Sequence, residues 1–415
     1  MSGIRAVKGM RDLLPPETAL WNHLEGLVRE VFHTYGYAEI RTPLVEETQL
    51  FARSVGAETD IVSKEMYTFE DPAGRDSLTL RPEATASVVR AYIEHSLWQR
   101  PGVTKLYYLG PMFRRERPQK GRYRQFSQIG AEAIGSESPA VDAEMLEMLC
   151  ALLDRAGLRD YRLLLNSLGD AACRPGYLEA LRQALSKVKD QMCGDCRRRA
   201  ETNPLRVLDC KVPGDQPIIE SLPRISDYLC APCKDHDGRL RGYLVDRAIP
   251  FTPAPRMVRG LDYYMRTTFE FVHESLGAQN SVLGGGRYDG LSEMLGGPKA
   301  PGIGFSIGED RLVYLLGEPP LSRLDVFVAW LDEESFRTAA DLARQLRKGG
   351  LAVDMPPERR KVGKLIEQAS KIGARYVLMV GENERASRRY GLKNLDTGKQ
   401  EELTLDEIHL KLKGA

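Results

Sequence analysis

The stretch FRRERPQKGRYRQF, residues 113–126, holds six basic side chains between two apolar segments. We expect those segments to be strands, over Lys105–Leu109 and Tyr123–Ile129, with the charged stretch as the loop that joins them. A charge run of this kind is most often a solvated hairpin tip. The competing interpretation is phosphate binding, because Arg114 adjoins an apolar strand end and a guanidinium grips phosphate with two parallel hydrogen bonds. In that case a nucleobase would stack on Phe126, and the loop arginines would hold a nucleic-acid backbone.

The segments before and around this loop predict a core of mixed helices and strands. Apolar residues recur at three- and four-residue steps from Glu17 to Tyr35, which predicts an amphipathic helix. A strand is expected over Ala38–Pro43 and a second helix over Arg81–Leu97. Because these elements do not alternate in regular βαβ units, we predict an α+β fold with an antiparallel sheet flanked by helices.

The residue composition and the predicted elements change at two places in the sequence. From about residue 170 to 255, helical stretches and scattered prolines predict an insertion, and glycine-dense strand segments resume from Arg259 to Leu316. Gly317–Ser322 predicts a linker, because its paired prolines continue neither a helix nor a central strand. We therefore predict a first domain over residues 1–322 and a second over 323–415. The second should be a small α/β domain, with strands at Asp325–Trp330, Leu351–Met355 and Arg375–Val380 and helices at Glu334–Lys348 and Lys361–Ile372.

Charge and hydropathy set limits on partners and location. The 59 basic and 58 acidic side chains leave a net charge of +1, so any nucleic-acid site must be a local patch. Met1–Pro16 has no apolar core of signal-peptide type, and no later stretch is apolar for long enough to span a bilayer. We expect a cytoplasmic protein without membrane contact.

Four of the seven cysteines form two CxxC pairs, Cys193 with Cys196 and Cys230 with Cys233. In a chain without a signal peptide this pattern favours reduced thiols over a disulfide framework. Two such pairs are the usual ligands of a closed tetrahedral zinc site, so a structural Zn²⁺ on these four residues is one interpretation. The other is four free, buried thiols.

Two glycine-rich segments allow close approach of a ligand or a backbone. They are PGIGFSIGEDR, residues 301–311, and GGGRYDG, residues 284–290. The first lacks the Gly-Lys-Ser/Thr end of a phosphate-binding Walker loop, and the second does not open a Rossmann unit. Taken singly, each is also compatible with ordinary tight turns.

Together these segments resemble the motifs of one enzyme family. Residues 113–126 and 301–311 resemble motifs 2 and 3 of class II aminoacyl-tRNA synthetases, and IRTPL, residues 40–44, resembles motif 1, the dimer-forming strand. RGLDYYMRT, residues 259–267, and residues 283–291 look like the two signatures peculiar to histidyl-tRNA synthetases. TLRPEAT, residues 79–85, matches the same family, so the resemblance spans the chain.

The resemblance implies a role for each matching residue. Glu83 and Thr85 would bind the α-amino group of histidine, with Gln128 nearby, and Glu132 and Tyr264 would hold its imidazole. Tyr263 and Arg259 would also belong to the histidine site. Arg114 would contact the α-phosphate of ATP, Glu116 the adenine amino group, Phe126 the adenine face and Arg311 the γ-phosphate. Arg259 would stabilise the transition state and, with Arg114, form the catalytic pair. Three positions depart from the family pattern: Ala84 stands where Gly is common, Ser127 where His is usual, and Asp310 where Glu is usual.

The implied reaction joins histidine to tRNA(His) through a histidyl-adenylate. Its substrates would be L-histidine, ATP with Mg²⁺, and tRNA, and the second domain would bind the anticodon. The family resemblance also implies a homodimer. Arginines fixed on strands suit this chemistry, because negative charge develops at phosphorus in the transition state.

Two alternatives from other functional classes share the fold. The regulatory subunit of ATP phosphoribosyltransferase would bind ligands without joining them, but it lacks the C-terminal domain and generally loses the motif 2 and Arg259 signatures, which are intact here. A tRNA-binding or interaction protein is the third hypothesis. The presence of Glu83, Arg114, Arg259 and Arg311 favours the enzyme.

Overall fold

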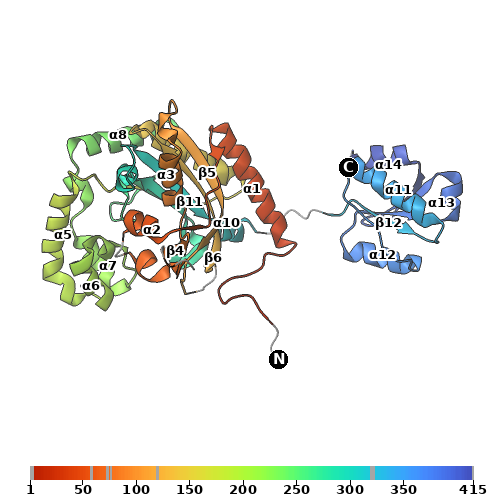
Figure 1. Cartoon of the computed structure of the whole chain (residues 1–415), viewed down its shortest axis with the longest axis horizontal. Coiled ribbons are helices and arrows are strands. Elements are labelled where there is room, and N and C mark those ends of the chain that lie inside the picture. The colour runs from red at the N-terminus through yellow and green to blue at the C-terminus, as the bar shows by residue number, and fades with distance from the viewer. Residues whose placement is uncertain are drawn as a thin grey trace. The chain divides into compact units, whose positions relative to one another are not determined.

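The chain divides into two compact units, Met1–Pro319 and Pro320–Ala415 (Figure 1). The computed structural model describes residues 4–56, 59–71, 74, 77–117, 121–317 and 323–413. The linker expected at Gly317–Ser322 therefore lies, beyond Gly317, outside the described residues. None of the helices among the described residues combines the length and apolar character needed to cross a membrane.

An eight-stranded sheet forms the centre of the first unit, in the order β1-β5-β6-β11-β10-β9-β7-β8. All pairings from β5 to β7 are antiparallel, and the two short edge strands pair in parallel, β1 with β5 and β8 with β7. The antiparallel α+β core predicted from the sequence is confirmed. The strands are β1 (Ala38–Glu39), β5 (Thr104–Phe113), β6 (Gln125–Ile134), β7 (Arg162–Ser167), β8 (Thr252–Pro253), β9 (Met265–Val272), β10 (Ser281–Arg287) and β11 (Gly302–Gly308).

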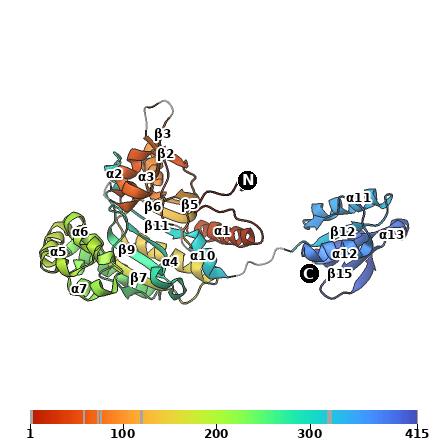
Figure 2. The ribbon, with the colours of Figure 1, turned by 90° about the horizontal axis from the view of Figure 1, so that it is seen from below.

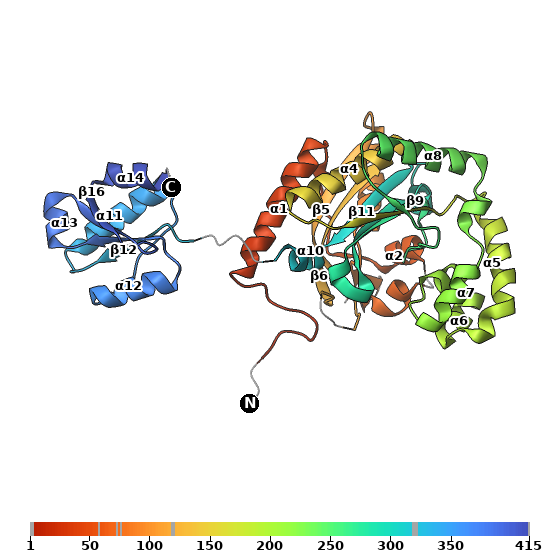
Figure 3. The same ribbon diagram turned by 180° about the vertical axis from the view of Figure 1, so that it is seen from behind.

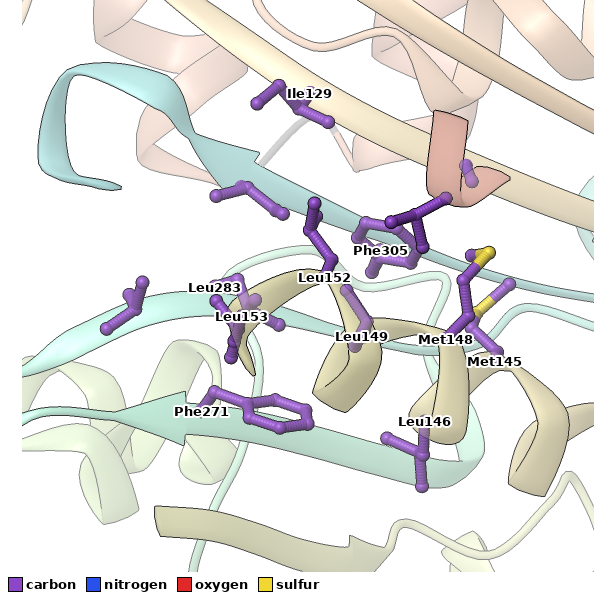
Figure 4. Close-up of a cluster of buried hydrophobic side chains, with 14 of the residues drawn as sticks. Ile129, Met145, Leu146, Met148, Leu149, Leu152, Leu153, Phe271, Leu283 and Phe305 are labelled. Atoms are coloured by element: carbon purple, nitrogen blue, oxygen red, sulfur yellow. The ribbon is translucent and has the colours of Figure 1, made fainter. Parts of the chain in front are cut away.

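Helix α4 (Pro139–Arg155) packs against one face of this sheet. It contacts α1 (Glu17–Thr34) and α8 (Ala231–Asp246), so that the three helices form a layer, with α10 (Glu309–Leu316) against α1 (Figure 3). Ser138 caps α4, because its side chain accepts a hydrogen bond from the Ala140 amide and Pro139 follows it. An apolar core between α4 and the sheet includes Leu146, Leu149, Leu152, Leu153, Phe271, Leu283 and Phe305 (Figure 4).

A second layer covers the other face of the sheet. The alternation along β5 directs Tyr107 toward α1, whereas Leu106 and Tyr108 join a separate cluster with α3 (Thr85–Glu94). A small antiparallel sheet, β2-β4-β3, lies beside this layer. The remaining elements here are β2 (Val45–Glu47), α2 (Thr48–Val55), a π-helical turn (Ile61–Glu65), β3 (Tyr67–Glu70), β4 (Ser77–Leu80), α9 (Leu291–Met294) and a 3₁₀ helix at Leu97–Gln99. A further 3₁₀ segment, Glu274–Gln279, joins β9 to β10, and its Leu276 packs against the core that contains α4.

The insertion between β7 and β8 is helical and has a hydrophobic core of its own. Its helices α5 (Arg174–Val188), α6 (Gly194–Thr202) and α7 (Gln216–Ser221) gather at one side of the unit, and the chain returns through α8 (Figure 2). Short 3₁₀ helices join them, at Lys189–Gln191, Pro204–Asp209, Pro213–Asp215 and Ile225–Tyr228.

The second unit has a mixed sheet in the order β13-β12-β14-β15-β16. Alternate residues of β12 face opposite ways: Val326, Val328 and Trp330 pack with α11 and α14, and Phe327 and Ala329 pack with α12. The elements are β12 (Val326–Trp330), α11 (Ser335–Lys348), β13 (Val353–Asp354), α12 (Val362–Lys371), β14 (Tyr376–Val380), α13 (Glu382–Ser387), β15 (Tyr390–Asn394), β16 (Gln400–Leu403) and α14 (Leu405–Lys413).

Three predicted elements differ from those observed. The strand expected over Leu351–Met355 has only two residues, Val353 and Asp354. The strand expected over Ala38–Pro43 has only two residues in ladder pairing, Ala38 and Glu39. The helix expected from Arg81 begins at Thr85, because the Arg81 guanidinium is buried and donates to the carbonyl oxygens of Thr42 and Pro111. Arg81 thus lies outside the helix and holds the preceding segment in place through these hydrogen bonds.

Candidate active site

Two adjoining cavities lie in the first unit. The larger, about 300 Å³, is lined by residues of the charged loop, of β9 and β10, and of the start of α10, including Arg114, Glu116, Phe126, Glu270 and Arg311. The smaller, about 170 Å³, is lined by Glu83, Thr85, Tyr108, Tyr263 and Tyr264, among others. Both cavities share Arg114, Gln128, Arg259, Gly260 and Ser306 in their walls. The two arginines predicted to be catalytic therefore stand where a cationic cavity meets an acidic and aromatic one.

Arg114 sits at the end of β5 and is fixed by its neighbours. Its Nε donates to the Pro82 carbonyl oxygen at 2.9 Å, and its guanidinium lies over the Phe126 ring, 5.3 Å from the centroid. Nη1 lies 3.8 Å from a carboxylate oxygen of Glu116. A guanidinium held in this way needs little reorganisation to receive an anionic group.

Glu116 and Arg311 line the larger cavity at other positions. Glu116 accepts a hydrogen bond from Arg122 at 3.1 Å, so its carboxylate is oriented by the loop. Arg311, in the first turn of α10, donates to the Ser281 carbonyl oxygen at 2.8 Å. Burial lowers the pKa of Arg311, and the nearby positive charge of Arg122 lowers it further. The charged form of Arg311 is therefore disfavoured in the free protein, and a bound anion would stabilise it.

Arg259 lies in the segment before β9 and is held by that strand and its neighbour. Its guanidinium donates to the Glu270 carboxylate and lies over the Tyr264 ring, 5.5 Å from the centroid. Burial opposes its charge, but Tyr264 and Glu270 outweigh burial and raise the pKa of Arg259. Gly284 provides the space, because a Cβ there would lie 2.5 Å from Nη1 and 2.6 Å from Nη2 of Arg259.

The start of α3 forms one wall of the smaller cavity. Both oxygens of the buried Glu83 carboxylate accept backbone hydrogen bonds, from Thr85 at 2.7 Å and from Ala86 at 3.0 Å. Burial raises the pKa of Glu83, and these hydrogen bonds oppose the rise. Glu83 thus caps α3 and presents a carboxylate to the cavity at the same time.

Gln128 and the tyrosines supply uncharged polar groups to this cavity. Gln128 Oε1 and Tyr108 Oη are buried and have no hydrogen-bond partner within the described part of the chain. Tyr263 and Tyr264 are buried side by side, with ring centroids 4.8 Å apart. Buried polar atoms without partners carry a free-energy cost that a polar ligand would relieve.

Glu132 lies behind the wall of the smaller cavity and not in it. Its carboxylate is fully buried on β6 and accepts hydrogen bonds from Thr85 Oγ1 at 2.8 Å and Tyr288 Oη at 2.6 Å. Burial raises the pKa of Glu132 to about 8 despite these two donors. Thr85, which does line the cavity, is therefore the group through which Glu132 reaches it.

The sequence interpretation missed three residues of this region: Glu270, Tyr108 and Tyr288. Glu270 carried a signal, because it is the one charged residue between Phe269 and Phe271 in an apolar strand. Tyr108 and Tyr288 carried none, since a tyrosine in an apolar segment is an ordinary core residue.

The arginine of the GGGRYDG segment has a structural role. Arg287 is fully buried and pairs with Asp142 at 2.7 Å and Asp289 at 2.9 Å, and it donates to the carbonyl oxygens of Ser136 and Ser138. Removing one member of such a pair leaves a buried charge without compensation. Arg287 therefore holds β10 to α4 and lines neither cavity.

Two of the three departures from the family pattern meet in space. The Ser127 amide donates to Asp310 at 3.3 Å, and Arg11 donates to the same carboxylate at 3.0 Å. The two substitutions at these positions thus share one local environment beside the larger cavity.

The zinc site expected on Cys193, Cys196, Cys230 and Cys233 is wrong in its ligand set. Cys193 and Cys196 gather with Cys210 and Asp215, whereas Cys230 and Cys233 gather with Cys173 and Asp170. The first pair opens α6 and the second opens α8, and each packs against a different loop of the insertion. Spacing identified the pairs but not their partners.

Comparisons with known proteins agree with this geometry. The family model described as histidyl-tRNA synthetase matches residues 9–312, and that described as anticodon binding domain matches 325–414. The chain is 63% identical to the histidine-tRNA ligase of Solibacter usitatus (strain Ellin6076) over 99% of each chain. It is 60% identical to that of Koribacter versatilis (strain Ellin345), over 98% of this chain and 95% of the relative. Among solved structures, apo histidyl-tRNA synthetase of S. aureus superposes with a TM-score of 0.82 at 39% identity, over 99% of this chain and 100% of the other.

Proposed function

Because the chain belongs to the histidyl-tRNA synthetase family, we propose that it joins L-histidine to tRNA(His) with ATP as the energy source. The observation that carries the proposal is the shared wall of the two cavities. An anion in the larger cavity and an amino acid in the smaller one would meet between Arg114 and Arg259.

In the first step, a carboxylate oxygen of histidine attacks the α-phosphorus of ATP, and the bond to pyrophosphate breaks. Histidyl-adenylate and pyrophosphate are the products. Negative charge grows on the phosphoryl oxygens during the attack, and Arg114 and Arg259 would stabilise it. Glu116 and Phe126 would hold the adenine, and Arg311 the γ-phosphate.

In the smaller cavity, Glu83, Thr85 and Gln128 would bind the α-ammonium group of histidine. Tyr263 and Tyr264 would form the walls around its imidazole. Glu132 would orient Thr85 by accepting the hydrogen bond from its hydroxyl. A site that hydrogen-bonds the ring nitrogens would reject an analogue without them by roughly 10⁴–10⁵.

Mg²⁺ would accompany the ATP. Magnesium is commonly held by one or two carboxylates together with substrate phosphates, and Glu270 offers a carboxylate in the wall of the larger cavity. The donor set fits the ion. When bound, it would neutralise charge on the phosphates.

In the second step, a tRNA hydroxyl attacks the carbonyl carbon of the adenylate, and AMP leaves. The second unit would bind the anticodon, and the charged loop that carries Arg115, Arg117 and Arg122 would meet the acceptor end. Arg359, Arg360, Arg388 and Arg389 supply local positive charge on the second unit.

The active form would be a homodimer in the cytoplasm. Leu44, in the segment that resembles the dimer-forming motif, is 43% exposed, the adjacent Val45 is 39% exposed, and Met294 is 49% exposed. Exposed apolar side chains of this size favour burial against a second chain. All seven cysteines are free, which suits a reducing compartment.

Histidine-dependent exchange of labelled pyrophosphate into ATP tests the proposal. The expected result is exchange that requires histidine, followed by charging of tRNA(His) in a second assay. Binding of both ligands without exchange would instead identify a regulatory protein of the same fold.

A further inference from the structure

Two clusters of cysteine and aspartate lie in the insertion, outside both cavities. One consists of Asp170, Cys173, Cys230 and Cys233, and the other of Cys193, Cys196, Cys210 and Asp215. Within each cluster, one side-chain sulfur or oxygen atom per residue lies within 4.8 Å of all the others. We propose that each cluster binds one structural Zn²⁺ through three thiolates and one carboxylate, so that the insertion carries two closed zinc sites.

The distances in the second cluster match a tetrahedron. With zinc–sulfur bonds of about 2.3 Å, the sulfur atoms of a tetrahedral site lie about 3.8 Å apart, and a sulfur and an oxygen lie about 3.6 Å apart. The observed separations are 3.9 Å between the sulfurs of Cys193 and Cys210, and 3.3 Å between Cys210 Sγ and Asp215 Oδ2. A disulfide would need about 2.05 Å between the sulfurs. These two separations are therefore close to those of a single tetrahedral site.

Backbone amides point at these sulfurs. The Cys196 amide donates to Cys193 Sγ at 3.5 Å, and the Val212 amide donates to Cys210 Sγ at 3.4 Å. In the first cluster the Cys230 amide donates to Cys173 Sγ at 3.0 Å. Such donors favour the thiolate, which is the form that binds a metal.

Asp215 argues against three packed free thiols as the full account of the second cluster. Its side chain is only 3% exposed, and it accepts hydrogen bonds from the Cys193 amide and the Cys210 thiol. No Lys, Arg or His among the described residues forms an ion pair with it. A buried carboxylate without a cation is costly, and Zn²⁺ would supply the missing charge.

The first cluster joins the two ends of the insertion. Asp170 and Cys173 stand where the chain leaves β7 for α5, and Cys230 and Cys233 stand in the first turn of α8, through which it returns. Cys230 Sγ lies 3.8 Å from both Asp170 oxygens. Gly169 makes the approach possible, because its φ is +61° and a Cβ there would lie 2.6 Å from Cys173 Cβ.

The size of the insertion gives a reason for metal sites. Its core is formed by short helices and 3₁₀ turns without a strand among the described residues from 174 to 229. Hydrophobic burial in a segment this small provides limited stability, and small domains commonly add structural metals. One ion would close the insertion at its base, and the other would hold α6 to the following loop.

Metal analysis of the full chain, purified with reductant and without chelator, tests the proposal. We expect about two zinc ions per wild-type chain. Cys210→Ala and Cys173→Ala should each retain about one, the double variant almost none, and the matched control Cys150→Ala, on α4 outside both clusters, about two. Wild-type protein with less than a tenth of an equivalent, or a single variant that loses all zinc while remaining folded by circular dichroism, would overturn it.

X-ray absorption at the zinc edge on wild-type protein provides a test that needs no variant. The expected average shell is three sulfurs at about 2.3 Å and one oxygen at about 2.0–2.2 Å. A shell of four sulfurs would overturn the pairing with Asp170 and Asp215. A disulfide between Cys193 and Cys210 in the same sample would overturn the second site.

Discussion

The guanidinium of Arg259 donates a hydrogen bond to the carboxylate of Glu270, and both line the larger cavity. Glu270 lies on β9 directly opposite Gly284 of β10. The missing side chain of Gly284 leaves the space that the guanidinium occupies. The carboxylate of Glu270 and the missing side chain of Gly284, on adjacent strands, therefore set the orientation of Arg259, which we propose stabilises the transition state.

Glu270→Ala should lower the rate of histidyl-adenylate formation by about 10²-fold, because a misplaced catalytic group typically costs that much. Glu270→Gln, which keeps a hydrogen-bond acceptor, should lose less. Pyrophosphate exchange measures both. Glu274→Gln is the matched control, since Glu274 is 85% exposed and lies just beyond the same strand. Equal exchange rates for Glu270→Ala and the control would show that Glu270 does not position Arg259.

Gly284→Ala should reduce exchange at least tenfold with little loss of stability. The new Cβ would meet the mobile end of Arg259 rather than backbone, so the guanidinium would move and the fold would remain. Gly238→Ala, on α8 with nothing within 4 Å of the added Cβ, is the control. If Gly284→Ala keeps full exchange, the space at Gly284 does not direct Arg259.

Replacing Glu132 should change how stability depends on pH. The folded protein holds the Glu132 proton up to about pH 8, whereas an unfolded chain releases it near about pH 4.3. Between those values unfolding releases this proton, so the contribution of Glu132 to the free energy of unfolding should fall as pH rises, by about 1.4 kcal/mol per pH unit. Glu132→Gln lacks this contribution. Denaturant titrations of both proteins at pH 6 and pH 8 measure the difference, and parallel pH profiles would contradict it.

Much of the fold could be predicted from the sequence, because periodicity marks α1, α11 and the long strands β5 and β6 directly. Strand pairing across the insertion could not. The CxxC spacing identified two pairs of ligands, but the third and fourth members are isolated residues, Cys173 with Asp170 and Cys210 with Asp215, that only the fold brings near.

The sequence also could not show which site residues line the cavity and which are buried behind its wall. The motifs predicted that Thr85 and Glu132 both contact histidine, and nothing in the sequence says that Thr85 lines the cavity while Glu132 lies behind it. Glu270 could have been found, since a carboxylate between two phenylalanines of a central strand needs a partner.

Deleting residues 323–415 should leave histidine-dependent exchange within a few fold and weaken tRNA charging at least tenfold. Every residue assigned to ATP and histidine lies in the first unit, which has its own core. Losing phosphate contacts should also flatten the salt dependence of tRNA binding, by about one unit of logarithmic slope per contact. Filter binding at several salt concentrations measures this. Unchanged tRNA affinity, with loss of the dimer in sedimentation, would assign the second unit to assembly instead.

The most direct test of the account is pyrophosphate exchange by Arg259→Ala beside Arg162→Ala, whose side chain is 57% exposed and remote from the cavities. Loss of one donor to developing charge typically costs about 10²–10³ in rate. We predict a loss of that size for Arg259→Ala, with histidine binding still measurable by calorimetry and normal exchange in the control. Near-normal exchange by folded Arg259→Ala would contradict the role of Arg259 in the transition state.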